Sequence, residues 1–226
     1  MIVKNEAEFI EPCIRQVVPY VNRILIGVDS RSSNGTKDIV DRLAKEFLNI
    51  YVEYFYLGEN WQEDLVKVQN AQLKATTEEW IWSLDGDEYY PTYSIKRLIE
   101  HLNKDIYDGY AFKFWYLVDK EHIYNRKQFV GHLERIWRNK PTLYWKGKFP
   151  GTHIHDGKLY MWFRKTERVR RLDDVEYIHF SRLKKSSWRK DMEGIELYNG
   201  KYLKKVPEHI QTEIDKVYGY SSTHNN

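Results

Sequence analysis

The sequence has little cysteine and no long apolar run, and each shortage excludes a class of protein. The single Cys13 excludes an internal disulfide and fits a reducing compartment. No apolar run reaches the roughly 18 residues that a membrane-spanning helix needs, and Lys4-Asn5-Glu6 interrupts any signal-peptide pattern. We therefore expect a cytoplasmic protein without a transmembrane segment, and a peripheral contact with a membrane surface stays open.

A large excess of charge of one sign is also lacking. Lysine and arginine total 36 against 33 aspartate and glutamate, a net charge of +3. This excess is too small to indicate a nucleic-acid partner. The one basic cluster, residues 164–171, is interrupted by Glu167 and followed by Asp173 and Asp174. We interpret it as a solvated or acceptor-facing surface and expect no nucleic-acid binding.

Repeats and low-complexity linkers are absent as well, so the 226 residues are expected to form one domain. Asn5 is expected to cap a first helix. Apolar strands then alternate with amphipathic helices, at 23–28, 37–47, 50–57, 62–75 and 80–84. This alternation predicts an α/β fold with a central, mostly parallel or mixed sheet and helices on both faces.

The pattern changes after Glu88. A helix at 93–102 and a long aromatic strand at 109–118 are followed by short strand-like pieces, and two closing helices are expected at 186–198 and 207–218. The domain thus has three parts, at about 1–105, about 106–182 and 183–226.

The most informative stretch is Trp80 to Glu88. Its apolar beginning predicts a strand buried on both faces, which ends in Asp85-Gly86-Asp87-Glu88. Open α/β sheets bind ligands at the carboxyl ends of their strands, and Gly86 allows a sharp turn close to a ligand. Carboxylates this close repel, so they need a cation, and oxygen ligands suit Mg²⁺ or Mn²⁺. The alternative is a solvated turn without a metal.

Several motifs together resemble those of family 2 glycosyltransferases with the GT-A fold. In the N-terminal half they are Met1-Ile2-Val3-Lys4-Asn5-Glu6, Val28-Asp29-Ser30-x-Ser32-x-x-Gly35-Thr36, Asn70-Ala71-x-Leu73 and Trp80-Ile81-x-x-Leu84-Asp85-x-Asp87-Glu88. Looser matches follow at Glu134-Arg135-x-x-Arg138, Gly151-x-x-Ile154-His155-Asp156 and His179-x-Ser181. The resemblance covers about residues 1–190.

The resemblance implies a nucleotide-diphosphosugar donor, a divalent cation (Mn²⁺ or Mg²⁺) and inverting transfer to an acceptor hydroxyl. It assigns residues to three roles. The donor-binding residues would be Lys4, Glu6, Asp29, Asn70 and Asp85; the metal ligands would be Asp85, Asp87 and His179; the general base would be Asp156.

Each assignment has a structural alternative. Asp29, at the end of a strand, suits a bond from a ribose hydroxyl or a base N–H, but it could instead cap the next helix. Asp156 could be a turn residue before Gly157. His179 could be a half-buried strand histidine bonded to the backbone.

The sequence departs from the family pattern in ways that keep other functions open. The first strand is nearly absent, Gln69 stands where an arginine often precedes Asn70, and Asp156 stands where glutamate is usual. One alternative is a catalytically silent GT-A domain that serves as a binding or structural module. Another is a sugar nucleotidyltransferase, although the Gly-rich phosphate loop which that chemistry needs is not seen near the first strand. The base, the sugar and the acceptor, whether glycan, lipid-linked or protein, are not determined.

Overall fold

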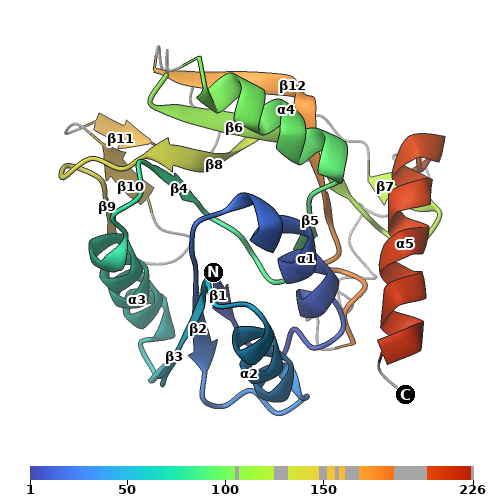
Figure 1. Ribbon diagram of the computed structural model, residues 1–226, viewed down its shortest axis with the longest axis horizontal. Coiled ribbons are helices and arrows are strands. Elements are labelled where there is room, and N and C mark those ends of the chain that lie inside the picture. The colour runs from blue at the N-terminus through green and yellow to red at the C-terminus, as the bar shows by residue number, and fades with distance from the viewer. Residues whose placement is uncertain are drawn as a thin grey trace.

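The computed structural model describes residues 1–104, 107–124, 132–147, 152–155, 158–160, 168–185 and 203–224. The described part forms helices around two main sheets (Figure 1). The helices are α1 (Ile10–Val17), α2 (Thr36–Glu46), α3 (Trp61–Ala75), α4 (Thr92–Leu102) and α5 (Glu208–His224), with a short 3₁₀ turn, η1 (Val18–Tyr20), after α1. In the described part, no helix combines the length and the apolar character that a membrane crossing requires.

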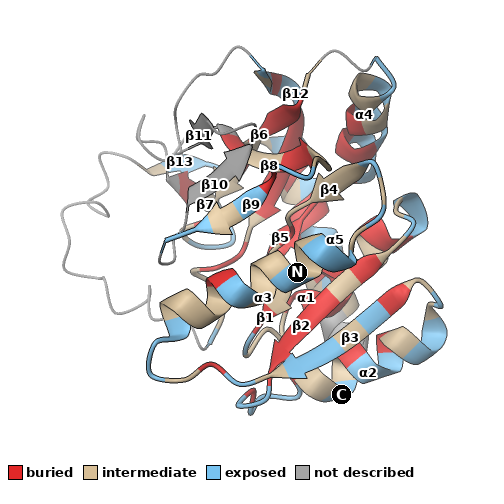
Figure 2. Cartoon of the chain, turned by 90° about the vertical axis from the view of Figure 1, so that its left-hand side faces the viewer, coloured by how far each residue is buried: buried red, intermediate tan, exposed pale blue. Residues whose placement is uncertain are grey.

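The first sheet is parallel and has the order β1 (Ile2–Val3), β2 (Ile24–Asp29), β3 (Ile50–Phe55). Its middle strand is largely buried because it is apolar on both faces, whereas β3 at the edge is largely exposed (Figure 2). In the parallel register Val3 pairs with Val28 and Asp29 pairs with Phe55. The residues that follow β1 and β2 therefore emerge at the same edge of the sheet.

The expected run of parallel strands does not include the fourth strand. β4 (Trp80–Trp82) pairs antiparallel with β8 (His132–Arg138) in a second, mixed sheet. The order of this sheet is β4, β8, β6 (Gly109–Tyr116), β12 (Val169–His179), β5 (Glu88–Tyr89), and only β6 and β12 are parallel. β4 is also only half-buried, not buried on both faces as expected.

Two smaller sheets complete the described strands. One has the order β11 (Lys158–Tyr160), β10 (Thr152–His155), β9 (Tyr144–Lys146), and the other pairs β13 (Leu203–Lys205) with β7 (His122–Tyr124). The helices α2, α3 and α4 lie close to their predicted bounds, whereas α5, expected at 207–218, continues to His224. The helix expected at 186–198 falls outside the described residues.

One apolar core joins the two main sheets. It runs from Val28 on β2 and Ile14 on α1 to Phe112 on β6 and Tyr177 on β12, all fully buried. A second cluster fixes α5 against α1 through Phe9, Cys13 and Ile214. Burial of this much apolar surface is the main stabilising term, so the two sheets form a single rigid support for the site between them.

The predicted cap of the first helix is wrong. The helix begins later, with Phe9 at its N-cap, and Asn5 instead adopts a left-handed conformation with φ 56°. Asparagine tolerates this region because its short side chain bonds locally. Here the Asn5 side-chain oxygen accepts a 2.8 Å hydrogen bond from the Ser33 backbone N–H, so Asn5 joins the segment after β1 to the segment after β2.

A buried carboxylate, Glu11, connects three helices. Its oxygens accept hydrogen bonds from Arg15 on α1 (3.0 Å), Arg42 on α2 (2.8 Å) and the Tyr220 hydroxyl on α5 (2.9 Å). Burial alone would raise the pKa of Glu11, but the bonds from Arg42, Tyr220 and Arg15 outweigh burial and lower the pKa to about 2.

We expect Glu11→Gln to lower the free energy of unfolding at pH 7 by about 1.5–3 kcal/mol, because charge-assisted hydrogen bonds are lost. A folded-state pKa below the unfolded value of 4.5 stabilises the protein above pH 4.5, and this contribution disappears as the pH falls toward 2. The difference between wild type and variant in urea unfolding should therefore shrink from pH 5 to pH 3. Glu100→Gln, at an exposed ion pair with Arg97, is the control and should change little at either pH. If the difference in unfolding free energy between wild type and Glu11→Gln did not change with pH, the low pKa of Glu11 would be contradicted.

Candidate functional site

The turn after β4 carries the acidic motif and packs directly against the segment after β1. A Cβ added at Gly86 would lie 2.9 Å from Cγ of Glu6 and 3.0 Å from Cγ1 of Val3. Gly86 does not adopt a positive φ, so the glycine is required for this close approach and not for an unusual turn. It is what allows Asp85, Asp87 and Glu6 to share one site.

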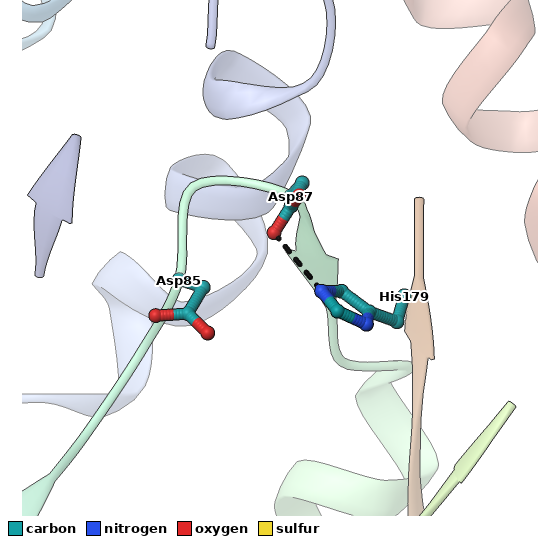
Figure 3. A group of neighbouring side chains, drawn as sticks. All are labelled: Asp85, Asp87 and His179. Carbon is teal, nitrogen blue, oxygen red and sulfur yellow. Dashed lines mark ion pairs between the residues drawn. The ribbon is translucent and has the colours of Figure 1, made fainter. Parts of the chain in front are cut away.

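Three predicted metal ligands come together at this turn. One ligand atom from each of Asp85, Asp87 and His179 lies within 4.8 Å of the other two, and His179 reaches Asp87 from the end of β12 (Figure 3). Ligands about 2.1 Å from a cation lie within about 4.2 Å of one another, so a small inward shift completes the set. Two carboxylates and an imidazole suit Mn²⁺, and Mg²⁺ to a lesser degree. These residues fit a divalent cation.

The solvated-turn alternative is wrong for Asp87 and Glu88, which are both buried, whereas Asp85 is about half exposed. Asp87 Oδ1 lies 3.4 Å from His179 Nε2, and its Oδ2 lies 2.8 Å from Lys184 Nζ. Burial alone would raise the pKa of Asp87, but the neighbouring His179 and Lys184 outweigh burial and hold the pKa well below its usual value. Asp87 is therefore ionised, and Lys184 already pairs with one of its oxygens.

Lys184 also contacts Glu6, at 2.6 Å. The other carboxyl oxygen of Glu6, Oε2, is buried and makes no hydrogen bond. Burial and the neighbouring Asp87 raise the pKa of Glu6 to about 8, against the opposing effect of Lys184. A buried acceptor without a donor is costly, so this oxygen marks a place where a further donor or cation would be favourable.

A second buried ion pair lies behind the acidic turn. The Arg135 guanidinium, from β8, contacts the fully buried Glu88 and also Asp85, at 3.1 Å from Oδ2. Glu88 accepts a further bond from the Tyr90 hydroxyl at 3.2 Å, and Arg135 lies over the Tyr177 ring. Arg135 thus helps to position Asp85.

Beside this cluster lies a cavity of about 480 Å³, within the range typical of small-molecule sites. It is lined by charged residues at the carboxyl edge of the parallel sheet and by aromatic and apolar residues, among them Lys4, Glu6, Asp29, Arg31, Phe55 and Trp61. Because Glu6 lines the cavity and also contacts Lys184, the cavity and the metal cluster are neighbouring parts of one site.

The other predicted donor-binding residues are placed differently. Lys4 and Asp29 line the cavity, but the Asp29 oxygens accept bonds from Arg31 Nε (3.1 Å) and Nη2 (2.8 Å), and Asp29 makes no side-chain cap to the next helix. Asn70 does not line this cavity. Its amide bonds both the N–H and the C=O of Trp145, which joins α3 to β9. Asp156 lies outside the described residues.

Sequence reasoning gave no role to Lys184, Arg135 or Arg31. Arg135 stands in one of the matched motifs, and Lys184 follows His179 closely. Closeness to a motif in the sequence is therefore the one feature that could have marked these residues as part of the site. Nothing in the sequence indicates that these cations are directed at Glu6, Asp87, Glu88 and Asp29, since those contacts depend on tertiary structure.

Comparison with known proteins gives a consistent result. The family model "Glycosyl transferase family 2" matches residues 1–169. The glycosyltransferase SunS of the Bacillus subtilis SPbeta prophage is 32% identical over 90 residues, which is 40% of this chain and 19% of SunS. An uncharacterized glycosyltransferase of Mycoplasma genitalium, MG060, is 28% identical over 119 residues, 49% of this chain and 38% of MG060.

Among solved structures, residues 1–349 of TarS from S. aureus superpose with a TM-score of 0.52 at 15% identity, over 79% of this chain and 58% of that chain. This likeness supports the GT-A fold and nothing finer. The chain spans less than half the length of the curated relatives named above.

We expect Arg135→Met to lower the free energy of unfolding by about 3–5 kcal/mol, because it leaves Glu88 buried without its cation. Adding Glu88→Gln to this variant should recover part of the loss, and a double-mutant cycle in urea unfolding measures the coupling. Arg97→Met, which removes an ion pair between two exposed side chains, Arg97 and Glu100, is the control and should cost about 1 kcal/mol or less. Additive effects of Arg135→Met and Glu88→Gln would show that the two do not act as a pair.

Proposed function

The chain belongs to glycosyl transferase family 2, and we propose that it is a metal-dependent, inverting glycosyltransferase. It moves a sugar from a nucleotide-diphosphosugar donor to an acceptor hydroxyl. The observation that carries the proposal is the joining of the cavity to the metal cluster through Glu6 and Lys184. A donor needs this arrangement, because its diphosphate lies between the nucleoside and the metal-binding carboxylates.

The residues divide the work by their chemistry. Asp85, Asp87 and His179 would hold a divalent cation, which would supply Lewis-acid stabilisation of the diphosphate leaving group. Lys4 and Arg31 add positive charge in the cavity, where Asp29 orients Arg31 by its paired hydrogen bonds. The aromatic rings of Phe55 and Trp61 offer flat surfaces for a nucleobase.

The general base is assigned to Asp156 from the motif resemblance alone. As the acceptor oxygen bonds to the anomeric carbon, its proton passes to the Asp156 carboxylate. The bond from the anomeric carbon to the phosphate oxygen breaks, and its electron pair leaves with the nucleoside diphosphate. Attack opposite the leaving group inverts the anomeric centre.

TarS has been solved in complex with UDP-GlcNAc, with a likeness to half of this chain at a TM-score of 0.41. That likeness is too weak to assign a donor. It gives UDP-GlcNAc a place as the first compound in a screen of nucleotide sugars for metal-dependent donor hydrolysis. A catalytically silent domain would bind a nucleoside diphosphate with Mn²⁺ but hydrolyse none of the donors.

Asp85→Asn should leave the fold nearly unchanged, because the side chain is about half exposed and Arg135 keeps its pair with Glu88. It should lower donor hydrolysis by about 10²-fold or more, since several kcal/mol of charge stabilisation depend on the bound cation. Wild type should be thermally stabilised by nucleoside diphosphate with Mn²⁺, and the variant much less so. Glu79→Gln, an exposed carboxylate just before β4, is the control. Activity that survives both EDTA and Asp85→Asn would rule out metal dependence.

Asp156→Asn should keep the stabilisation by nucleoside diphosphate and Mn²⁺ but lower transfer by about 10²- to 10⁴-fold, because only proton removal is disabled. The two measurements, thermal shift and transfer rate, separate a base from a binding residue. If transfer fell by less than tenfold, another residue would have to be the general base. Glu134 on β8, whose pKa is raised by burial, is then the next carboxylate to test.

A further inference from the structure

Lys184 occupies the junction between the cavity and the metal cluster. Its ammonium lies 2.6 Å from Glu6 Oε1 and 2.8 Å from Asp87 Oδ2. Glu6 lines the cavity, and Asp87 belongs to the group that could hold a metal ion. The three side chains are largely buried, with 12% of Glu6, 6% of Asp87 and 14% of Lys184 exposed. A lysine cation thus neutralises the same carboxylate that a divalent cation would use.

Hydrogen bonds hold the backbone on both sides of Lys184, whereas the lysine side chain can change conformation. The Phe180 N–H bonds the Asp87 carbonyl (2.9 Å), and the Leu183 N–H bonds the Phe180 carbonyl (2.8 Å). The Lys185 N–H bonds Glu8 at 2.8 Å, so the turn after β12 is held on both sides of Lys184. The lysine stem is a flexible four-carbon chain. The ammonium can therefore change partner without a change in the backbone.

A lysine cation and a divalent cation on one carboxylate repel each other. The repulsion is strong here because the carboxylate is buried and its surroundings screen charge poorly. A diphosphate lying between the cavity and the metal cluster would offer the ammonium a new anionic partner. Moving from Asp87 to the diphosphate would remove the repulsion and leave Asp87 to the metal.

We propose that Lys184 couples metal binding to diphosphate binding. Without a donor it blocks Asp87 and keeps the affinity for a divalent cation low; with a donor it contacts the diphosphate and admits the cation. Lys184 is a positioning and substrate-contacting residue in this scheme. The inference rests on the proposed function, because it presupposes a site for a metal and a diphosphate.

The test measures the two ligands separately, with probes that need no knowledge of the nucleobase. The affinity for Mn²⁺ alone is followed by the electron paramagnetic resonance signal of free Mn²⁺. The affinity for inorganic pyrophosphate is followed by calorimetry with Mg²⁺ in excess. The variants are Lys184→Gln, which keeps hydrogen-bond donors for Glu6 and Asp87 but removes the charge, and Lys184→Arg, which keeps the charge. Lys185→Gln, the exposed neighbour, makes the same change in net charge and is the matched control.

Lys184→Gln should bind Mn²⁺ alone about tenfold or more tightly than wild type, and pyrophosphate about tenfold or more weakly. The opposite signs distinguish the proposal from a merely structural role, which would weaken both. Lys184→Arg should stay within about threefold of wild type for Mn²⁺, and Lys185→Gln should match wild type for both ligands.

Three results would overturn the proposal. The first is an unchanged or weaker Mn²⁺ affinity in Lys184→Gln. The second is a pyrophosphate affinity equal to that of Lys185→Gln. The third, which does not depend on the folding of Lys184→Gln, is a Lys184→Arg variant that binds Mn²⁺ about tenfold more tightly than wild type. If no variant and no wild type binds Mn²⁺, with or without pyrophosphate, the metal-dependent function itself fails, and this outcome is distinguishable from the other three.

Discussion

The candidate site depends on one buried negative charge, the Asp87 carboxylate, held between His179 and Lys184. A buried carboxylate is stable only when cations or hydrogen-bond donors compensate for its lost hydration. The imidazole comes from β12 and the ammonium from the turn that follows it. The need to compensate one charge thus joins the turn after β4 to a segment about 90 residues further along the chain.

Local sequence patterns predicted the helices and strands because amphipathic periods and strand-end carboxylates are local features. The bounds of α2, α3 and α4 follow from them, and the grouping of Asp85, Asp87 and His179 agrees with the motif interpretation. The pairing of β4 could not be predicted in the same way. Trp80-Ile81-Trp82 is compatible with the interior of a parallel sheet and with an antiparallel ladder, and only the tertiary arrangement decides between them.

The structure adds partners in the site that the motifs do not indicate. The two Asp29 carboxyl oxygens accept bonds from Arg31. The Asn70 amide joins α3 to β9. A carboxylate or an amide in a motif shows what chemistry is available. Which neighbour uses that chemistry depends on long-range packing, and a single sequence does not encode that packing in a local pattern.

The short pairing of β5 with β12, in which His179 lies opposite Glu88, has a consequence for how the protein folds. Adjacent residues of a strand point to opposite faces, so a slip of one residue would turn the imidazole away from the carboxylates. Contacts between such distant segments form slowly, because a long loop must close first. The acidic turn and its imidazole should therefore meet only when both sheets have docked, which makes assembly of the candidate metal ligands a late event in folding.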